Sequence, residues 1–433
     1  MNYKVTILPN KIDFIKSSWL DKSGKVFRYN HKIYRALTSH GLEIAEYIIK
    51  SPNIENIYSS GLIETQFADF NIENYQAVIE HKTLDFVSYP QEWSMAMLKD
   101  AAIMFCRLNI ELMKLGLICK DSHPWNITYH FTTPLFIDFG SIEFINNINI
   151  NSWLKEFELH FYIPLWLAAI GRIDLARYSL QEHPSGFGKK FLSNKLMKYI
   201  LWQYRYLSKK AEYKFEYFLH SLIKHIENLN IIVAQGEWSN YSQANWKKNI
   251  LEEILKKYEI YSVIDMAANK GEFAKIVAEK NITVVATDVD EYSIDDLYKK
   301  SSIEKLKIIP LVINYLRPTK PFGVGLFYQN SCERLKADMS ISLGIMHHLI
   351  FKNNVNFQVI ENIISNYTKK FILIEFIPKN DNYVSNWLKD KKEKYDWYNR
   401  NNFIQVFSQK YQLLQQWKCP HNNREIFLFI TKK

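Results

Sequence analysis

Hydrophobic and polar positions follow two different patterns along this chain of 433 residues. In the N-terminal half, short alternating segments are mixed with longer amphipathic stretches, which predicts a few strands packed with helices. After residue 245, short apolar runs alternate regularly with amphipathic stretches. Helices that alternate with apolar strands are typical of a parallel sheet with helices on both faces. We therefore expect an α+β region followed by an α/β domain built on a doubly wound, mostly parallel sheet.

The individual elements follow from the same pattern. Asn30-His31 separates two strand-like segments and predicts a hairpin turn, and an amphipathic helix over 93–116 should end at Gly116. We expect three parts: an α+β region over 1–150, a helical extension over 151–237 and an α/β domain over 238–433. In the last part we predict helices at 246–258, 272–280, 291–300 and 355–367, further helices within 383–409, and strands at 261–266, 282–287, 307–313, 338–344, 370–377, 411–417 and 424–430.

Composition and charge narrow the possible functions. The 55 basic residues exceed the 45 acidic ones, but acids interrupt the basic segments, as in the run 389–394, so we expect no strong nucleic-acid binding. No two of the four cysteines have metal-ligand spacing, and the first residues do not resemble a signal peptide, so we expect a cytoplasmic protein with reduced thiols. The longest apolar stretch, 161–171, is shorter than the ~20 residues of a membrane span. We therefore expect no transmembrane segment.

A candidate cofactor site begins where the first strand of the C-terminal half ends. Val263 to Phe273 reads as an apolar strand that ends in Asp265, followed by a turn of small residues and a helix start. In doubly wound sheets, ligands bind at the carboxyl ends of the strands, and small residues let the backbone approach a ligand closely. Asp288 ends the second strand, where a carboxylate can accept both hydroxyls of a ribose, and Asn314 follows the third strand, where an adenine ring is usually contacted.

This order of elements resembles the class I S-adenosylmethionine-dependent methyltransferases. The resemblance implies that S-adenosylmethionine is the cofactor and that the first turn, with Ala267 where a glycine is usual, corresponds to the glycine-rich cofactor motif. The residues predicted to bind the cofactor are Asp265, Ala267, Asn269, Gly271, Asp288 and Asn314.

Three side chains beyond the cofactor motif are candidates for catalysis. His347 and His348 follow the fourth strand, beside the place where a methyl group would be presented, and either could act as a general base or merely pack. Glu375, at the end of the fifth strand, could bind the acceptor or a metal, or accept backbone hydrogen bonds.

The resemblance can be narrowed by three further segments. They are similar to a bacterial family, the nodulation-protein-like methyltransferases, and the similarity spans about residues 20–430. The family implies a methyltransferase domain joined to an N-terminal kinase-like region, and it leaves the acceptor open, although some members belong to glycan pathways. The segments are Ser88-Tyr89-Pro90-Gln91-Glu92-Trp93, then Cys119-Lys120-Asp121-Ser122-His123-Pro124-Trp125-Asn126 with Phe136-Ile137-Asp138-Phe139-Gly140-Ser141, and Ile374-Glu375-Phe376-Ile377-Pro378-Lys379.

The N-terminal half carries a second candidate site. Asp121 and Asn126 have Asp-x-x-x-x-Asn spacing, and Asp138 opens Asp-Phe-Gly. In kinase-like folds the first Asp orients the acceptor hydroxyl, while the Asn and the second Asp hold Mg²⁺. A glycine-rich phosphate loop is not visible, however, and Arg35 stands in the strand where a lysine is expected, with Glu43 or Glu46 as possible partners.

These observations favour a methyltransferase whose acceptor is a small molecule or a glycan. The first alternative is an ATP-dependent phosphotransferase with an accessory methyltransferase domain, which would use Mg²⁺ at Asn126 and Asp138. The second is a non-catalytic scaffold. The acceptor, the methylated atom and the oligomeric state are not predicted.

Overall fold

The computed structural model describes residues 5–18, 21–181, 203–209, 214–236, 245–388 and 393–432. The chain divides into two compact units. Unit 1 contains Met1–Ala234 together with Pro321–Gln329, and unit 2 contains Gln235–Lys320 and Asn330–Lys433. The predicted boundary at 237/238 and most of the charged run 389–394 lie outside the described residues. The sequence did not predict that 321–329 belongs with unit 1.

Unit 1 begins with a five-stranded antiparallel sheet in the order β2-β3-β4-β7-β5. The predicted turn is confirmed: Asn30 and His31 have φ values of 48° and 64°, and both lie in the left-handed region that a tight two-residue hairpin turn requires. Helix α1 follows β4 and buries Ile44, Ala45 and Ile48. The elements are β2 (Asp13–Phe14), β3 (Gly24–Tyr29), β4 (Lys32–Leu37), α1 (Ser39–Ile49), α2 (Ile54–Ser59), β5 (Thr65–Phe67) and β7 (Ala77–His81), with a separate parallel pair β1 (Val5–Ile7) and β6 (Phe70–Ile72).

The rest of unit 1 is mainly helical. The predicted long helix is α3 (Met95–Met113), capped by the Ser94 hydroxyl, which accepts a hydrogen bond from the amide of Met97, and followed by Gly116 with a φ of 73°. Two short antiparallel pairs follow it and carry the predicted kinase-like residues between their strands. The remaining elements are β8 (Leu117–Cys119), β9 (Ile127–His130), β10 (Thr133–Phe136), β11 (Ile142–Phe144), α4 (Ile150–Phe157), α5 (Ile163–Ala169), α6 (Ile173–Ser179) and α8 (Phe215–Glu227).

Unit 2 is built on a seven-stranded sheet in the order β14-β13-β12-β15-β16-β18-β17. Strands β12 to β16 are mutually parallel, and β18 is antiparallel to both of its neighbours. The chain builds outward from β12 to β14 on one side and then returns to add β15 on the other side. The sheet is therefore doubly wound, with its switch point between β12 and β15. The strands are β12 (Ser262–Met266), β13 (Thr283–Asp288), β14 (Ile308–Val312), β15 (Ala337–Ser342), β16 (Thr368–Phe376), β17 (Tyr411–Lys418) and β18 (Glu425–Thr431).

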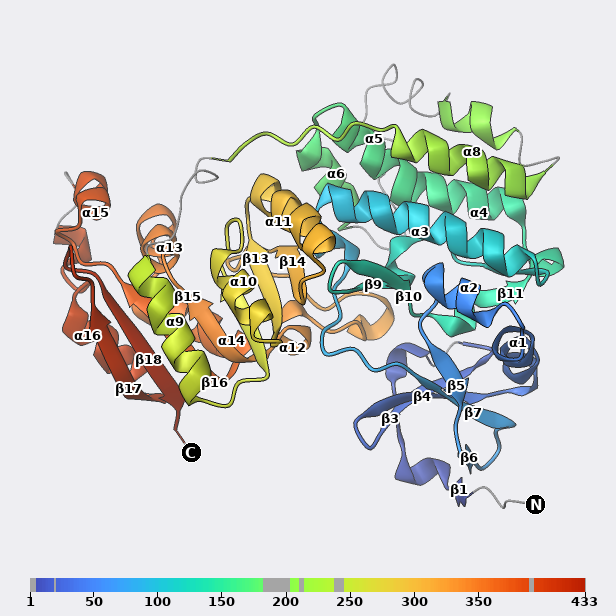
Figure 1. Ribbon diagram of the computed structural model, residues 1–433, viewed down its shortest axis with the longest axis horizontal. Coiled ribbons are helices and arrows are strands. Elements are labelled where there is room, and N and C mark those ends of the chain that lie inside the picture. The colour runs from blue at the N-terminus through green and yellow to red at the C-terminus, as the bar shows by residue number, and fades with distance from the viewer. Residues whose placement is uncertain are drawn as a thin grey trace. The chain divides into compact units, whose positions relative to one another are not determined.

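Helices cover both faces of this sheet (Figure 1), and its central strands are accordingly buried at nearly every position. One face packs Val263, Met339 and Leu428 against α9, α10 and α11. Phe427, which points to the opposite face, packs against Phe403 of α16 with ring centroids 5.2 Å apart. The helices are α9 (Asn245–Lys257), α10 (Glu272–Glu279), α11 (Glu291–Glu304), α12 (Ser331–Arg334), α13 (Met346–Asn353), α14 (Phe357–Tyr367), α15 (Asn382–Trp387) and α16 (Arg400–Phe407).

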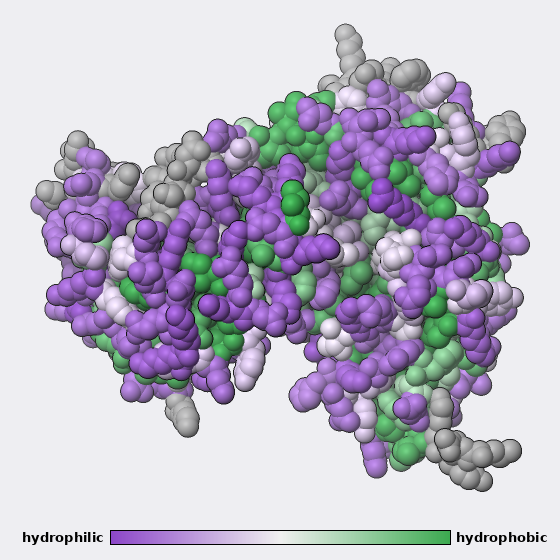
Figure 2. Space-filling model, viewed as in Figure 1, coloured by the Kyte–Doolittle hydropathy of each residue, from purple (hydrophilic) through white to green (hydrophobic). Residues whose placement is uncertain are grey.

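The expected mixed α/β fold is thus confirmed, with two omissions. The predicted strands and helices of unit 2 lie within a few residues of their observed bounds, but helices α12 and α13 were not predicted. Among the described residues, no helix is both long enough and apolar enough to span a membrane. On the face seen in Figure 2, hydrophilic residues cover most of the surface.

We expect His31→Gly to stabilise the protein. His31 has a left-handed φ of 64°, which costs energy for a residue with a Cβ atom, whereas glycine adopts this conformation freely. The free energy of unfolding in urea should rise by about 1 kcal/mol. His31→Ala, which keeps the Cβ atom, is the control and should give no gain; an equal gain in both variants would show that the side chain, not the backbone, is responsible.

Candidate active site

The turn after β12 has an unusual backbone. Ala267, Asn269 and Gly271 have φ values of 70°, 51° and 76°, so three residues of this short turn are left-handed. The amides of Ala267 and Ala268 both donate to the carbonyl of Thr287, at 2.9 and 2.8 Å, and so tie the turn to β13. A Cβ atom at Gly271 would lie 2.4 Å from the side chain of Leu297. The sequence pattern of small residues therefore reflects both backbone conformation and close packing.

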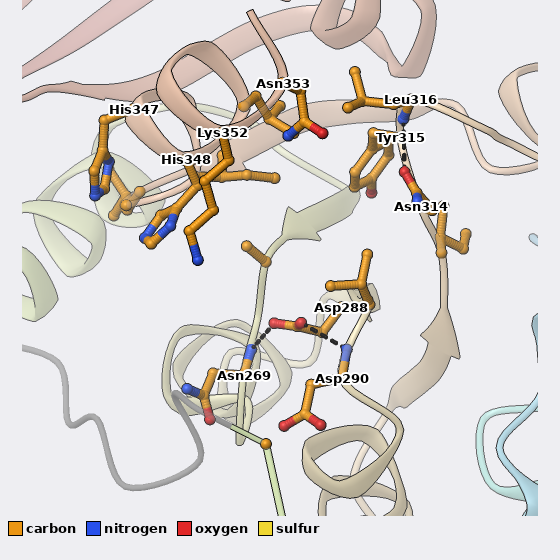
Figure 3. A pocket seen from close by; sticks show the side chains of 18 of the residues that line it. Asn269, Asp288, Asp290, Asn314, Tyr315, Leu316, His347, His348, Lys352 and Asn353 are labelled. Atoms are coloured by element: carbon orange, nitrogen blue, oxygen red, sulfur yellow. Dashed lines mark hydrogen bonds between the residues drawn. The ribbon is translucent and has the colours of Figure 1, made fainter. Parts of the chain in front are cut away.

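Asp288 ties the same turn to the end of β13. One carboxylate oxygen accepts the amide of Asn269 at 2.9 Å, and the other accepts the amide of Asp290 at 3.0 Å (Figure 3). A carboxylate offers about four acceptor positions, so these two bonds leave capacity for ligand hydroxyls. Asp290 caps α11 by accepting the amide of Tyr292.

A cavity of about 550 Å³ opens at this carboxyl edge of the sheet. Its walls come from the segments that follow β12, β13, β14 and β15, together with α13 and the short helix α15. Four of the predicted cofactor residues line it, namely Ala267, Asn269, Asp288 and Asn314. Gly271 and Asp265 do not line it; Gly271 shapes the turn, and Asp265 lies buried beneath it.

Asp265 is a buried carboxyl group with unmet hydrogen-bonding capacity. It is 1% exposed, and neither side-chain oxygen has a hydrogen-bond partner among the described residues. Burial, together with the charge of nearby Asp288, raises the pKa of Asp265 to about 7. Burial also raises the pKa of Asp288. This end of the cavity thus concentrates negative charge that a cationic ligand would relieve.

The two predicted histidines lie on α13, on the opposite side of the cavity (Figure 3). His347 stacks against the ring of Trp387, with centroids 5.6 Å apart and ring planes at 17°. Burial, reinforced by the nearby positive charges, lowers the pKa of His347 to about 2, so this imidazole is neutral at neutral pH. Its Nδ1 atom is buried and lacks a partner among the described residues.

Glu375 is held behind the cavity wall rather than in it. It is 1% exposed and does not line the cavity. The Nζ of Lys247 donates to one of its oxygens at 2.8 Å, and the Nη1 of Arg424 lies 4.0 Å from the other oxygen. Arg424 in turn holds Asp381 through Nε and Nη2, at 2.8 and 3.2 Å. A buried pair such as Lys247–Glu375 costs desolvation and is a poor source of stability, so it suggests a positioning role.

In unit 1, the structure brings together the three residues of the predicted kinase-like site. Asp121 follows β8 and accepts the hydroxyl of Ser141 at 2.9 Å. The carbonyl of Asn126 accepts the amide of Ile137, one residue before Asp138. Burial raises the pKa of Asp121; Ser141 and Lys120 lower it, and the charge of Asp138 raises it further.

The cation that contacts Asp138 is an arginine. The Nη2 of Arg35 donates to Asp138 at 3.0 Å, and its Nη1 pairs with Asp21. The expected partners Glu43 and Glu46 were wrong choices, and Glu46 pairs with Lys50 instead. Among the described residues, no three His, Cys, Asp or Glu side chains could hold a metal ion together. With a guanidinium already on Asp138, the donor set of Asn126 and Asp138 fits Mg²⁺ poorly, and the Mg²⁺ prediction gains no support.

Sequence reasoning missed several residues around the cavity of unit 2. Lys247 was overlooked, although Lys247, Ile250, Leu251 and Ile254 have the spacing of one buried helix face. Lys352 was missed because α13 was not predicted; on that helix, His348 and Lys352 are one turn apart and face the same way. The sequence around Trp387 and Arg424 does not indicate that they line a cavity, because only the fold brings them there.

Comparison with known proteins gives one relative that matches this chain over nearly its whole length. No family model matches the chain. It is 24% identical to the nodulation protein NoeA of Rhizobium meliloti (strain 1021), over 96% of this chain and 95% of that protein. Two solved structures are similar to less than half of the chain. They are the magnesium protoporphyrin IX methyltransferase ChlM from Synechocystis PCC 6803 with bound SAH (10% identity, 43% of this chain, 82% of that chain, TM-score 0.33) and the N-methyltransferase NodS from Bradyrhizobium japonicum WM9 with S-adenosyl-L-homocysteine (10%, 44%, 87%, TM-score 0.31). These TM-scores are too low to assign a function.

We expect Asp265→Asn to change the pH dependence of stability. Because the pKa of Asp265 is about 7 in the folded protein and 3.8 as a free side chain, folding favours the protonated carboxyl. Its stabilising contribution is complete below pH ~4 and is lost as the pH rises through 7. Asparagine cannot ionise, so the variant should gain stability relative to wild type between pH 4 and pH 8, by up to about 4 kcal/mol.

Thermal unfolding at pH 4.5 and pH 8 tests this expectation. Asp396→Asn is the control, because the Asp396 side chain is 81% exposed. If Asp265→Asn and Asp396→Asn show the same pH dependence, then Asp265 is not the titrating group.

Proposed function

We propose that the chain is an S-adenosylmethionine-dependent methyltransferase that binds its cofactor in the cavity of unit 2. One observation carries the proposal: the Asp288 carboxylate and the left-handed turn Ala267–Gly271 meet at the carboxyl edge of a doubly wound sheet, beside its switch point. The similarity to NoeA over 96% of the chain agrees with the resemblance to the nodulation-protein-like methyltransferases.

The residues of the cavity suit the parts of this cofactor. Asp288 would accept the ribose hydroxyls, and Asn314 and its neighbours after β14 would contact the adenine ring. The bound cofactor supplies a methyl group on a positively charged sulfur. The buried carboxyl of Asp265 and the carboxylates of Asp288 and Asp290 at this end favour such a cation electrostatically.

The acceptor side is formed by α13. We propose that the neutral His347 accepts a hydrogen bond from the acceptor and that His348 is the candidate general base, since His348 also lines the cavity. Glu375 lies behind the wall, so we assign it a positioning role through Lys247 and Arg424 rather than contact with the acceptor. Most of the rate would come from aligning the sulfur-bound methyl group with the nucleophile.

For unit 1 we propose a kinase-like scaffold that does not transfer phosphate. The arrangement of Asp121, Asn126 and Asp138 favours the phosphotransferase alternative. The position of Arg35 argues against phosphate transfer. Arg35 occupies the strand position where a phosphate-binding lysine is expected, and its guanidinium pairs with Asp138. Phosphoryl transfer requires the phosphates to be held and aligned as well as a carboxylate in place.

We expect Asp288→Ala to weaken binding of S-adenosylmethionine by about 1.5–3 kcal/mol, as for the loss of charge-assisted hydrogen bonds. Calorimetry on the full chain measures this. Asp338→Ala is the matched control, because Asp338 also accepts two backbone amides, from Tyr261 and Ser262, but at the opposite edge of the same sheet. Equal affinities for wild type and Asp288→Ala would place the ribose elsewhere.

We expect methyl transfer to proceed without ATP. The protein is incubated with labelled ATP and, separately, with labelled S-adenosylmethionine, over pools of glycans and metabolites. Label should move only from S-adenosylmethionine, and Asp138→Asn should leave the affinity for this cofactor within about twofold, because distant sites rarely couple strongly. Transfer of label from ATP that stops in Asp121→Ala would establish the phosphotransferase alternative instead.

A further inference from the structure

The cavity of unit 2 has two chemically different ends. The acidic side chains that line it, Asp288 and Asp290, both lie at the end formed by β12, β13 and β14. The other end is formed by α13 and by the segments that contribute Trp387 and Arg424. Figure 3 shows His348 and Lys352 reaching from α13 into the space across from Asp288. Among the described residues, no acidic side chain lines this second end.

Two cationic side chains and three aromatic rings line the second end. Lys352 and Arg424 line it, and the Nζ of Lys352 lies 5.7 Å from the centre of the Trp387 ring. The rings of His347 and His348 lie 5.6 and 5.1 Å from the same ring. The carboxylates that offset Arg424, those of Asp381 and Glu375, are behind the lining and do not reach the cavity surface. A ligand group at this end therefore meets cations and ring faces.

The pKa of His347 agrees with this asymmetry. The pKa of His347 is lowered to about 2 by burial first and then by His348, Arg424, Lys247 and Lys352. The cations Lys352 and Arg424 thus act on the same imidazole at the cavity wall. An anion placed there would relieve the repulsion among them, whereas a second cation would increase it.

We propose that the methyl acceptor carries an anionic group, a carboxylate or a phosphate, bound by Lys352 with the support of Arg424, and that a flat or apolar part of the acceptor lies against Trp387. This inference rests on the proposed methyltransferase function, because it treats the acidic end as the cofactor's. It assigns Lys352 as a specificity-determining residue for the acceptor. Lysine suits this task because its ammonium is a compact charge with three donors.

The test uses four probes of similar shape and different charge. Benzoate and phenyl phosphate are anionic, benzamide is neutral and benzylamine is cationic. Binding to the full chain saturated with S-adenosylhomocysteine is measured by ligand-observed NMR titration. At least one anion should bind about tenfold or more tightly than benzamide, as for one charge-assisted hydrogen bond, and benzylamine should bind weakest. The two anions distinguish a carboxylate acceptor from a phosphate acceptor.

Lys352→Gln should abolish the preference for the anion and leave the affinity for S-adenosylhomocysteine unchanged. The matched control is Lys369→Gln, because Lys369 lies near the start of β16 at the opposite edge of the sheet, with its Nζ 3.8 Å from Asp338. The control variant should keep the preference for the anion.

Four results would overturn the inference. One is binding without an anion preference, and a second is no binding of any probe at tens of millimolar. Another is an anion preference that survives in Lys352→Gln. The last is a loss of affinity for S-adenosylhomocysteine in Lys352→Gln with an unchanged preference among the probes, which would assign Lys352 to the carboxylate of the cofactor. Failure of S-adenosylhomocysteine to bind wild type would instead refute the methyltransferase proposal, and the anion preference would then be measured without it.

Discussion

Parallel pairing of β12 with both β13 and β15 is the constraint on which the candidate site depends. Parallel strands end at the same edge, and the return of the chain across β12 leaves a crevice at that edge. The turn after β12, the carboxylate of Asp288 and the segment after β14 converge there because their strands are in register. Hydrogen bonds from the turn to Thr287 and Asp288 then fix its left-handed residues in place.

Both units contain buried charged side chains. Asp265 has no hydrogen-bond partner among the described residues, Lys247 and Glu375 form a buried pair, and Arg35 lies between Asp21 and Asp138. Burial of such groups costs free energy that hydrophobic residues of similar size would not cost. In unit 2 these charges lie around a cavity. In unit 1 the arginine satisfies the carboxylate directly, which favours a scaffold over a metal-dependent enzyme.

The C-terminal sheet could be predicted closely from the sequence because several of its strands, such as β13, β14 and β18, contain nearly continuous apolar runs. Burial on both faces imposes that composition, and small or acidic residues mark where the runs end. The same reasoning identified Asp288 and the turn at Ala267–Gly271. It failed for α13, where Gly344 and the histidines interrupt the apolar pattern, so the helix that carries Lys352 was not visible.

The sequence alone determined most strands and helices of unit 2, the hairpin at Asn30-His31 and the residues that follow the first parallel strands, because these depend on local periodicity and backbone preference. Only the tertiary structure decided which charges meet. Lys247 and Glu375 are 128 positions apart, and Arg35 and Asp138 are 103 apart. No local pattern encodes such partners, because a charged side chain on a helix or strand is usually solvated. The fold alone removes the water and leaves one particular counter-ion within reach.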